Sequence, residues 1–211
     1  MDAPIALLSI LGALTIGAMS PGPSFVLVAR TSIAVSRRAG LAAALGMGVG
    51  GVSFAALALL GLHTLLSQVG WLYLGLKLAG GLYLVYLAVR IWRGAAEPIT
   101  VPDGAEGQPG GFARSFLFAL ATQLSNPKTA IVYGSIFAAL LPATPPAWVL
   151  LALPPAVFLI EAGWYAIVAV AFSAGRPRAA YLRSKTWIDR LAASVIGALG
   201  LRLVFEAAKP G

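Results

Sequence analysis

One acidic residue stands alone inside a long apolar stretch of this 211-residue sequence. Glu161 lies in the segment FLIEAGW, and it is the only charged residue between Lys128 and Arg176. A carboxylate far from water is costly unless it pairs with a cation or takes up a proton. Glu161 is therefore a candidate proton carrier or a site for an amino group. The alternative interpretation is a structural ion pair with Lys77 or Lys128.

A Pro-Gly-Pro motif at Pro21, Gly22 and Pro23 interrupts the first apolar stretch. A helix containing both prolines must break there, because proline lacks the N–H group of the helical ladder and clashes with the preceding turn. Free backbone groups at membrane depth are stable only beside a protein cavity, and in transporters the ends of broken helices bind carboxylate and ammonium groups. The motif predicts a site of this kind, and the alternatives are a simple kink or the end of a short span.

A second proline motif, Asn126-Pro127-Lys128, interrupts the fourth apolar stretch. Pro127 frees a carbonyl group one turn earlier, and Asn126 can satisfy freed backbone groups or contact a ligand. A lysine at the centre of a membrane helix costs about 2.5–3.5 kcal/mol, so Lys128 either serves a site or extends its side chain to the membrane surface. Lys77, in the third stretch, is interpreted either as a counter-ion of Glu161 or as a side chain that reaches the surface.

The elements that position these residues follow from the composition. Hydrophobic residues make up 59% of the chain and charged residues only 10%, against roughly 25% in an ordinary globular protein. A soluble fold of this size would lack polar surface, so the bilayer is the expected solvent. The absence of cysteine and the single histidine argue against thiolate sites, redox pairs and histidine-rich metal centres, and the sequence has no P-loop. Neither a metal nor another cofactor is therefore expected.

Six continuous apolar stretches predict an all-α integral membrane protein with six transmembrane helices. A spanning helix needs about 20 residues. Five stretches reach that length, whereas the sixth is short and contains Arg202, so it either spans the membrane or lies on its surface. The stretches are 4–29, 39–62, 70–89, 115–141, 148–174 and 191–205.

A polar segment rich in glycine and proline divides these stretches three and three. It predicts a first three-helix repeat at residues 1–92, a linker at 93–111 and a second three-helix repeat at 112–211. An odd number of spans per repeat makes the two repeats inverted, as in many secondary transporters, with helices broken at Pro-Gly-Pro and Asn-Pro-Lys.

The basic residues predict the orientation of the chain. Three, three and five of the fifteen basic residues fall in connections between the apolar stretches. Lysine and arginine mark cytoplasmic connections, so these segments are expected in the cytoplasm. The connections are 30–38, 90–114 and 176–190.

Taken together, the motifs resemble the LysE/RhtB family of amino-acid exporters over nearly the whole chain. The resemblance rests on Ser20-Pro-Gly-Pro-Ser24, Arg38 to Gly46 (RAGLAAALG), Lys77 to Leu84 (KLAGGLYL), Asn126-Pro-Lys-Thr-Ala130 and Glu161, where relatives often have aspartate. The sequence departs from the family after Pro142, where it has Ala143-Thr144 and relatives often have Gln-Phe.

The resemblance implies a transporter rather than an enzyme, with proton-coupled efflux of amino acids or related small metabolites across a bacterial-type cytoplasmic membrane. The implied partners are a small-molecule substrate, the proton and the bilayer, with no nucleic acid, and a homodimer is the oligomer to consider. By motif match the expected substrate-binding residues are Pro21, Gly22, Pro23, Asn126, Pro127, Lys128 and Glu161, with Glu161 also coupling the proton and Lys77 as a candidate counter-ion.

Two other classes of function stay open. A permease or channel for another solute, such as a metal cation, would be expected to place more carboxylates at membrane depth than the single Glu161. A membrane enzyme would need a nucleophile clustered with a base. Serines occur beside the proline motifs, but the only histidine, His63, falls in a predicted external loop.

Overall fold

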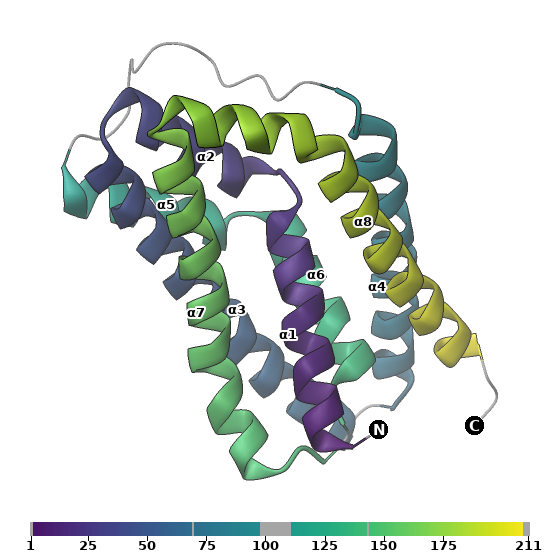
Figure 1. Ribbon diagram of the computed structural model, residues 1–211. Helices are drawn as coiled ribbons and strands as arrows, with labels where there is room; N and C mark the ends of the chain where they lie inside the picture. Colours follow the sequence, from purple (N-terminus) through teal and green to yellow (C-terminus); the bar gives the residue numbers. More distant parts are fainter. Residues whose placement is uncertain (1, 69, 98–110, 143, 209–211) are drawn as a thin grey trace.

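The computed structural model describes residues 2–68, 70–97, 111–142 and 144–208. These residues form eight helices and no strand, which confirms the predicted all-α class (Figure 1). Most of the predicted linker 93–111 lies outside the described residues. The helices are α1 (Ala3–Met19), α2 (Pro23–Ala34), α3 (Arg37–Gln68), α4 (Gly70–Gly94), α5 (Phe112–Leu124), α6 (Pro127–Leu140), α7 (Ala147–Phe172) and α8 (Gly175–Ala208).

In the part of the chain that the structure describes, two helices are long and apolar enough to cross a membrane. They are α3, over Arg37–Leu60, and the whole of α7. The pair α1 and α2 passes the same test together but is bent by 57°. α5 and α6 have only 13 and 14 residues, fewer than the roughly 20 that a bilayer requires. The arrangement of six spans in two repeats therefore stays a prediction.

The first pair of short helices meets at the Pro-Gly-Pro motif. α1 ends at Met19, and α2 begins at Pro23. Between them Ser20 and Gly22, which each precede a proline, have extended backbones. Proline disfavours a helical conformation in the residue before it, yet it fits the first turn of a new helix, where its missing N–H is not needed.

The second pair meets at Asn-Pro-Lys and is built in the same way. α5 ends at Leu124, and α6 begins at Pro127 after an extended Asn126. The Asn126 side chain accepts a hydrogen bond from the backbone N–H of Lys128 at 3.0 Å, so it caps the first turn of α6. That each motif divides one membrane span stays a prediction.

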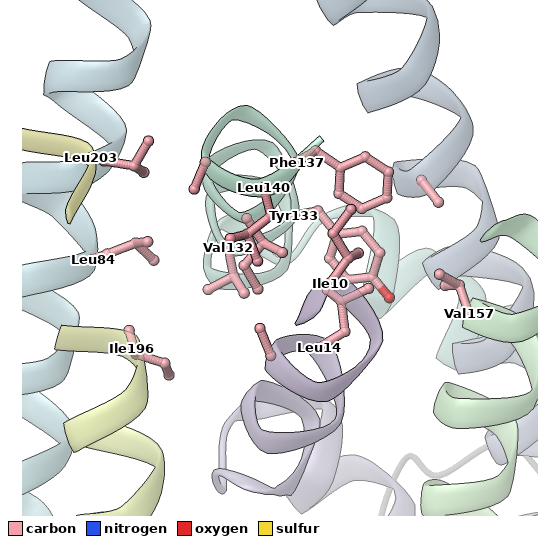
Figure 2. Packing of buried hydrophobic residues seen from close by; sticks show 14 of the residues in the cluster. Ile10, Leu14, Leu84, Val132, Tyr133, Phe137, Leu140, Val157, Ile196 and Leu203 are labelled. Carbon is pink, nitrogen blue, oxygen red and sulfur yellow. The ribbon is translucent and has the colours of Figure 1, made fainter. Parts of the chain in front are cut away.

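Two apolar cores hold the helices together. The larger lies around α1 and α6, where Ile10, Val132 and Phe137 pack between α7 on one side and α4 with α8 on the other (Figure 2). The smaller joins α2, α3 and α7, and its Phe25 ring meets the Phe172 ring edge-on with centroids 5.4 Å apart. The larger core thus holds two of the short helices between longer ones.

One predicted connection is helical instead. Residues 176–190, expected as a loop, form the first half of α8, which crosses one end of the molecule before it runs alongside α4 (Figure 1). Alanine, arginine and lysine favour a helix here, and Lys185 and Asp189 form an ion pair one turn apart at 2.8 Å. The prediction of a loop was wrong, because a basic segment is excluded from the lipid core but can still form a helix outside it.

α4 and α8 approach until their backbones touch. A Cβ atom placed on Gly81 would lie 2.8 Å from the carbonyl oxygen of Gly200. A Cβ atom placed on Gly200 would lie 2.7 Å from the carbonyl oxygen of Gly81. Neither position has room for a side chain, as is common where membrane helices pack closely.

We expect Gly81→Ala to destabilise the protein, because the added methyl group must push α4 and α8 apart. Overpacking of this kind typically costs about 1–3 kcal/mol. The matched control is Gly75→Ala in the same helix, where a Cβ atom meets nothing within 4 Å and alanine only improves helix propensity. Thermal unfolding in detergent should give a lower midpoint for Gly81→Ala alone. Equal midpoints for the two variants would contradict the close contact.

Candidate functional site

Glu161 lies in the middle of α7 with 3% of its surface exposed. Tyr133 of α6 donates a hydrogen bond from its hydroxyl to Oε1 at 2.8 Å, and Gln123 of α5 donates one from Nε2 to Oε2 at 3.3 Å. No cation forms a salt bridge with Glu161 among the side chains that the structure describes, which include Lys128. The side chain of Lys77, the candidate counter-ion, lies outside the described residues. Neutral donors therefore hold the carboxylate.

A line of hydrogen bonds runs from this carboxylate to both proline motifs. Ser24, in the first turn of α2, donates from its hydroxyl to Oε1 of Gln123 at 2.6 Å. Asn126, the cap of α6, donates from Nδ2 to the hydroxyl oxygen of Ser24 at 2.9 Å. These four side chains, including Glu161, are at most 5% exposed, so bulk water does not compete for the bonds. The carboxylate is therefore connected by hydrogen bonds to the helix starts at both motifs.

The backbone of α3 closes the site at Gly51. A Cβ atom there would lie 2.8 Å from Cγ of Glu161 and 3.0 Å from the hydroxyl oxygen of Tyr133. At Gly50, a Cβ atom would lie 2.6 Å from Cγ of Gln123. Because both positions lack a side chain, α3 packs directly on Glu161 and on both of its hydrogen-bond donors.

Lys128 joins the two proline motifs directly. It is the second residue of α6, and its ammonium group donates a hydrogen bond to the backbone carbonyl of Ser20 at 3.1 Å. This carbonyl follows the end of α1, where the negative end of the helix dipole favours a cation. Lys128 therefore points toward the first motif rather than out to the membrane surface.

Two cavities meet at the proline motifs. The smaller, of about 30 Å³, is lined by Glu161 and Tyr133 and has room for about one water molecule. The larger, of about 470 Å³, reaches the end of α4 and the first half of α8 and is large enough for a small metabolite. The residues that line both cavities are Ser20, Gly22, Asn126 and Lys128.

The predicted substrate-binding residues come together around these cavities, although 102 residues separate Ser24 from Asn126 in the chain. Glu161 lines the smaller cavity and not the larger one. Substrate binding by this set stays a prediction. The motif residues that line the larger cavity are Pro21, Gly22, Pro23, Asn126, Pro127 and Lys128.

Sequence analysis missed the partners that hold Glu161. Gln123 and Tyr133 precede it by 38 and 28 residues, and they lie on two other helices. For Gln123 a signal was present, because it is a polar residue in an apolar stretch, three positions before Asn126. Tyr133 gives no comparable signal, because tyrosine is also common in apolar cores.

A further unpredicted pair lies on α8 at the larger cavity. The Lys185 ammonium group donates to the carbonyl oxygens of Gly94 and Ala95, at 3.0 and 3.1 Å, and so caps the end of α4. The same group forms the ion pair with Oδ2 of Asp189. Burial raises the pKa of Asp189, and the hydrogen bond and charge of Lys185 oppose this shift. An acidic residue four positions after a lysine is the signal that could have revealed the pair.

Known proteins match the chain over most of its length. The model of the LysE type translocator family matches residues 15–207. The threonine efflux protein of Escherichia coli strain K12 is 33% identical over 192 residues, which cover 89% of this chain and 92% of that protein.

Two further relatives extend this likeness. The uncharacterised membrane protein YahN of the same bacterium is 32% identical over 208 residues, which cover 98% of this chain and 92% of that protein. The homoserine/homoserine lactone efflux protein of Salmonella typhimurium is 32% identical over 123 residues, or 58% of each chain. No solved structure gives a significant match. The extent of the family match shows that the chain belongs to the LysE type translocators.

Proposed function

We propose that this chain is a secondary transporter that exports amino acids or related small metabolites across a bacterial inner membrane. The relatives named for threonine and for homoserine efflux support the substrate class. The observation that carries the mechanism is Glu161, a buried carboxylate held by neutral donors and connected by hydrogen bonds to both proline motifs. We assign it the coupling proton.

We infer further that six spans form two inverted repeats, 1–92 and 112–211, joined by the linker 93–111. In such a pair of repeats α3 corresponds to α7, α4 to α8, and the pair α1 and α2 to the pair α5 and α6. The packing supports this correspondence, since α3 lies against α7, α4 against α8, α1 against α6 and α2 against α5. A two-fold axis in the membrane plane would place the corresponding helices α3 and α7, and α4 and α8, against each other, and it would exchange the contact of α1 and α6 with that of α2 and α5.

The basic residues support an orientation in which the larger cavity faces the cytoplasm. Arg90 and Lys185 line that cavity, and positively charged connections of membrane proteins face the cytoplasm. The smaller cavity, with Glu161, then lies farther along the path out of the cell. This arrangement corresponds to the inward-facing state of an alternating-access cycle. A homodimer stays a prediction from the family resemblance.

The direction of the hydrogen bonds supports the proposed proton coupling. With Glu161 ionised, every donor in the line from Asn126 onward points toward the carboxylate. When the proton is taken up on Oε2, the oxygen that faces Gln123, the carboxyl group becomes a donor there, and the Gln123 amide turns its carbonyl oxygen toward Glu161. Ser24 then loses its acceptor, and the contacts at both motifs change. Protonation therefore favours a different arrangement of the short helices, which is what a proton-driven exporter requires.

Glu161→Gln should abolish the response of transport to a pH gradient, because an amide cannot take up or release this proton. In proteoliposomes the variant should still exchange labelled for unlabelled threonine, while an imposed pH gradient should drive no net transport. The matched control is Asp2→Asn, an exposed carboxylate before α1 that caps no backbone group. Gradient-driven transport at the wild-type rate in Glu161→Gln would exclude Glu161 as the coupling site.

Gln123→Met should uncouple transport in the same way, because a thioether neither donates to Glu161 nor accepts from Ser24. The unsatisfied Ser24 hydroxyl should also lower stability by about 1–3 kcal/mol. Thr122→Val is the control on the same helix, since the Thr122 hydroxyl bonds to the carbonyl of Phe118. A double variant that combines Gln123→Met with Glu161→Gln should exchange threonine as fast as Glu161→Gln alone. Slower exchange in the double variant than in Glu161→Gln would leave Gln123 with a structural role only.

A further inference from the structure

The larger cavity holds two opposite charges on different helices. Lys128, at the start of α6, and Asp189, on α8, both line it and attract each other electrostatically. They form no direct ion pair within the described structure. A space between fixed opposite charges is suited to a ligand that carries both signs of charge.

Asp189 has an acceptor that the fold does not use. The residue is 4% exposed, its Oδ2 pairs with Lys185, and its Oδ1 is buried without a hydrogen-bond partner. A buried carboxylate oxygen without a donor is costly and uncommon in native structures. Capping α4 does not require this oxygen, because Lys185 bonds directly to the carbonyl groups there. The free oxygen is therefore suited to a cationic donor that enters the larger cavity.

Donors for an anion line the same cavity at the first proline motif. The Lys128 ammonium group has three N–H donors, one of which bonds to the Ser20 carbonyl. The Ser20 hydroxyl is also buried without a partner, and Ser20 lines the cavity together with Lys128. A carboxylate placed beside them would satisfy both groups.

We propose that the larger cavity is a loading site for a zwitterionic α-amino acid. Its ammonium group binds Oδ1 of Asp189, and its carboxylate binds the Lys128 ammonium group and the Ser20 hydroxyl. This inference rests on the proposed function and deepens it by naming the groups that recognise the substrate. The loading site is distinct from Glu161, which lines the smaller cavity, and its volume of about 470 Å³ leaves room for the substrate side chain.

Other charged residues on the cavity wall are already engaged or exposed. Lys185 caps α4, Arg90 lies over the Tyr86 ring at 5.9 Å, and Glu97 is exposed at the end of α4. An amine without a carboxylate would leave Lys128 without its anion, and an acid without an amine would leave Asp189 without its donor. The site therefore selects molecules that carry both charges.

Binding to the purified full chain in detergent tests the loading site. The probes are L-threonine, L-threonine amide, which lacks the carboxylate, and N-acetyl-L-threonine, which lacks the ammonium group. Asp189→Asn should raise the Kd for threonine by about tenfold or more, because one charge-assisted hydrogen bond is lost. The Kd for N-acetylthreonine should stay unchanged, because this probe lacks the ammonium group. Lys128→Met should raise the Kd for threonine similarly and leave that for the amide unchanged.

Three further variants separate recognition from folding. Asp189→Glu keeps the charge and should retain the preference for threonine over N-acetylthreonine. Glu97→Gln, on the same cavity wall, and Asp2→Asn, before α1, should both bind threonine with wild-type affinity. Thermal midpoints of all variants show which of them fold.

The outcomes are distinct. An unchanged Kd for threonine in a folded Asp189→Asn variant would overturn the loading site while the export function stands. An equal loss of affinity for threonine and N-acetylthreonine would do the same, because it assigns Asp189 a structural role. If the wild type bound neither threonine nor any other of the twenty protein amino acids, the proposed function would fail, and the loading site with it.

Discussion

The structure depends on keeping one carboxylate stable away from bulk water. With no salt bridge among the described side chains, the hydroxyl of Tyr133 and the amide of Gln123 hold Glu161 in place. Hydrogen bonds to a charged group are worth about 1.5–3 kcal/mol each, more than bonds between neutral groups. The donors come from α6 and α5, so these two short helices must converge on α7. Gly50 and Gly51 of α3 make that convergence sterically feasible.

The two proline motifs satisfy each other's freed polar groups. The Lys128 ammonium group meets the carbonyl at the end of α1, and Asn126 both caps α6 and donates to Ser24 at the start of α2. Backbone that leaves its helical ladder inside an apolar molecule requires such partners. Each motif supplies a hydrogen-bond partner to the other, so the two pairs of short helices form one structural unit.

The sequence allowed isolated charges to be identified and predicted an interruption of helix at each proline motif, where the structure has helix ends, but it did not reveal the contacts between distant helices. Glu161 can be identified from the sequence alone, because it is a single charged residue inside an apolar stretch. Its bond to Gln123 and the place of Asp189 at the cavity depend on which helices meet, which no local pattern encodes. The proline rule is also local: Pro154 and Pro155 lie inside α7 without ending it, and their neighbours Leu153 and Val157 are buried in the larger core, so tertiary packing favours the helix there.

The bond between Lys128 and the Ser20 carbonyl also acts as a latch between α1 and α6. An anion that binds the Lys128 ammonium group from the larger cavity competes with the Ser20 carbonyl for the positive charge of that group. In the proposed loading site, a substrate carboxylate therefore weakens this bond, which is strongest when the cavity is empty. Under that proposal, binding of the substrate loosens the contact between the two proline motifs, at the point where the short helices would move.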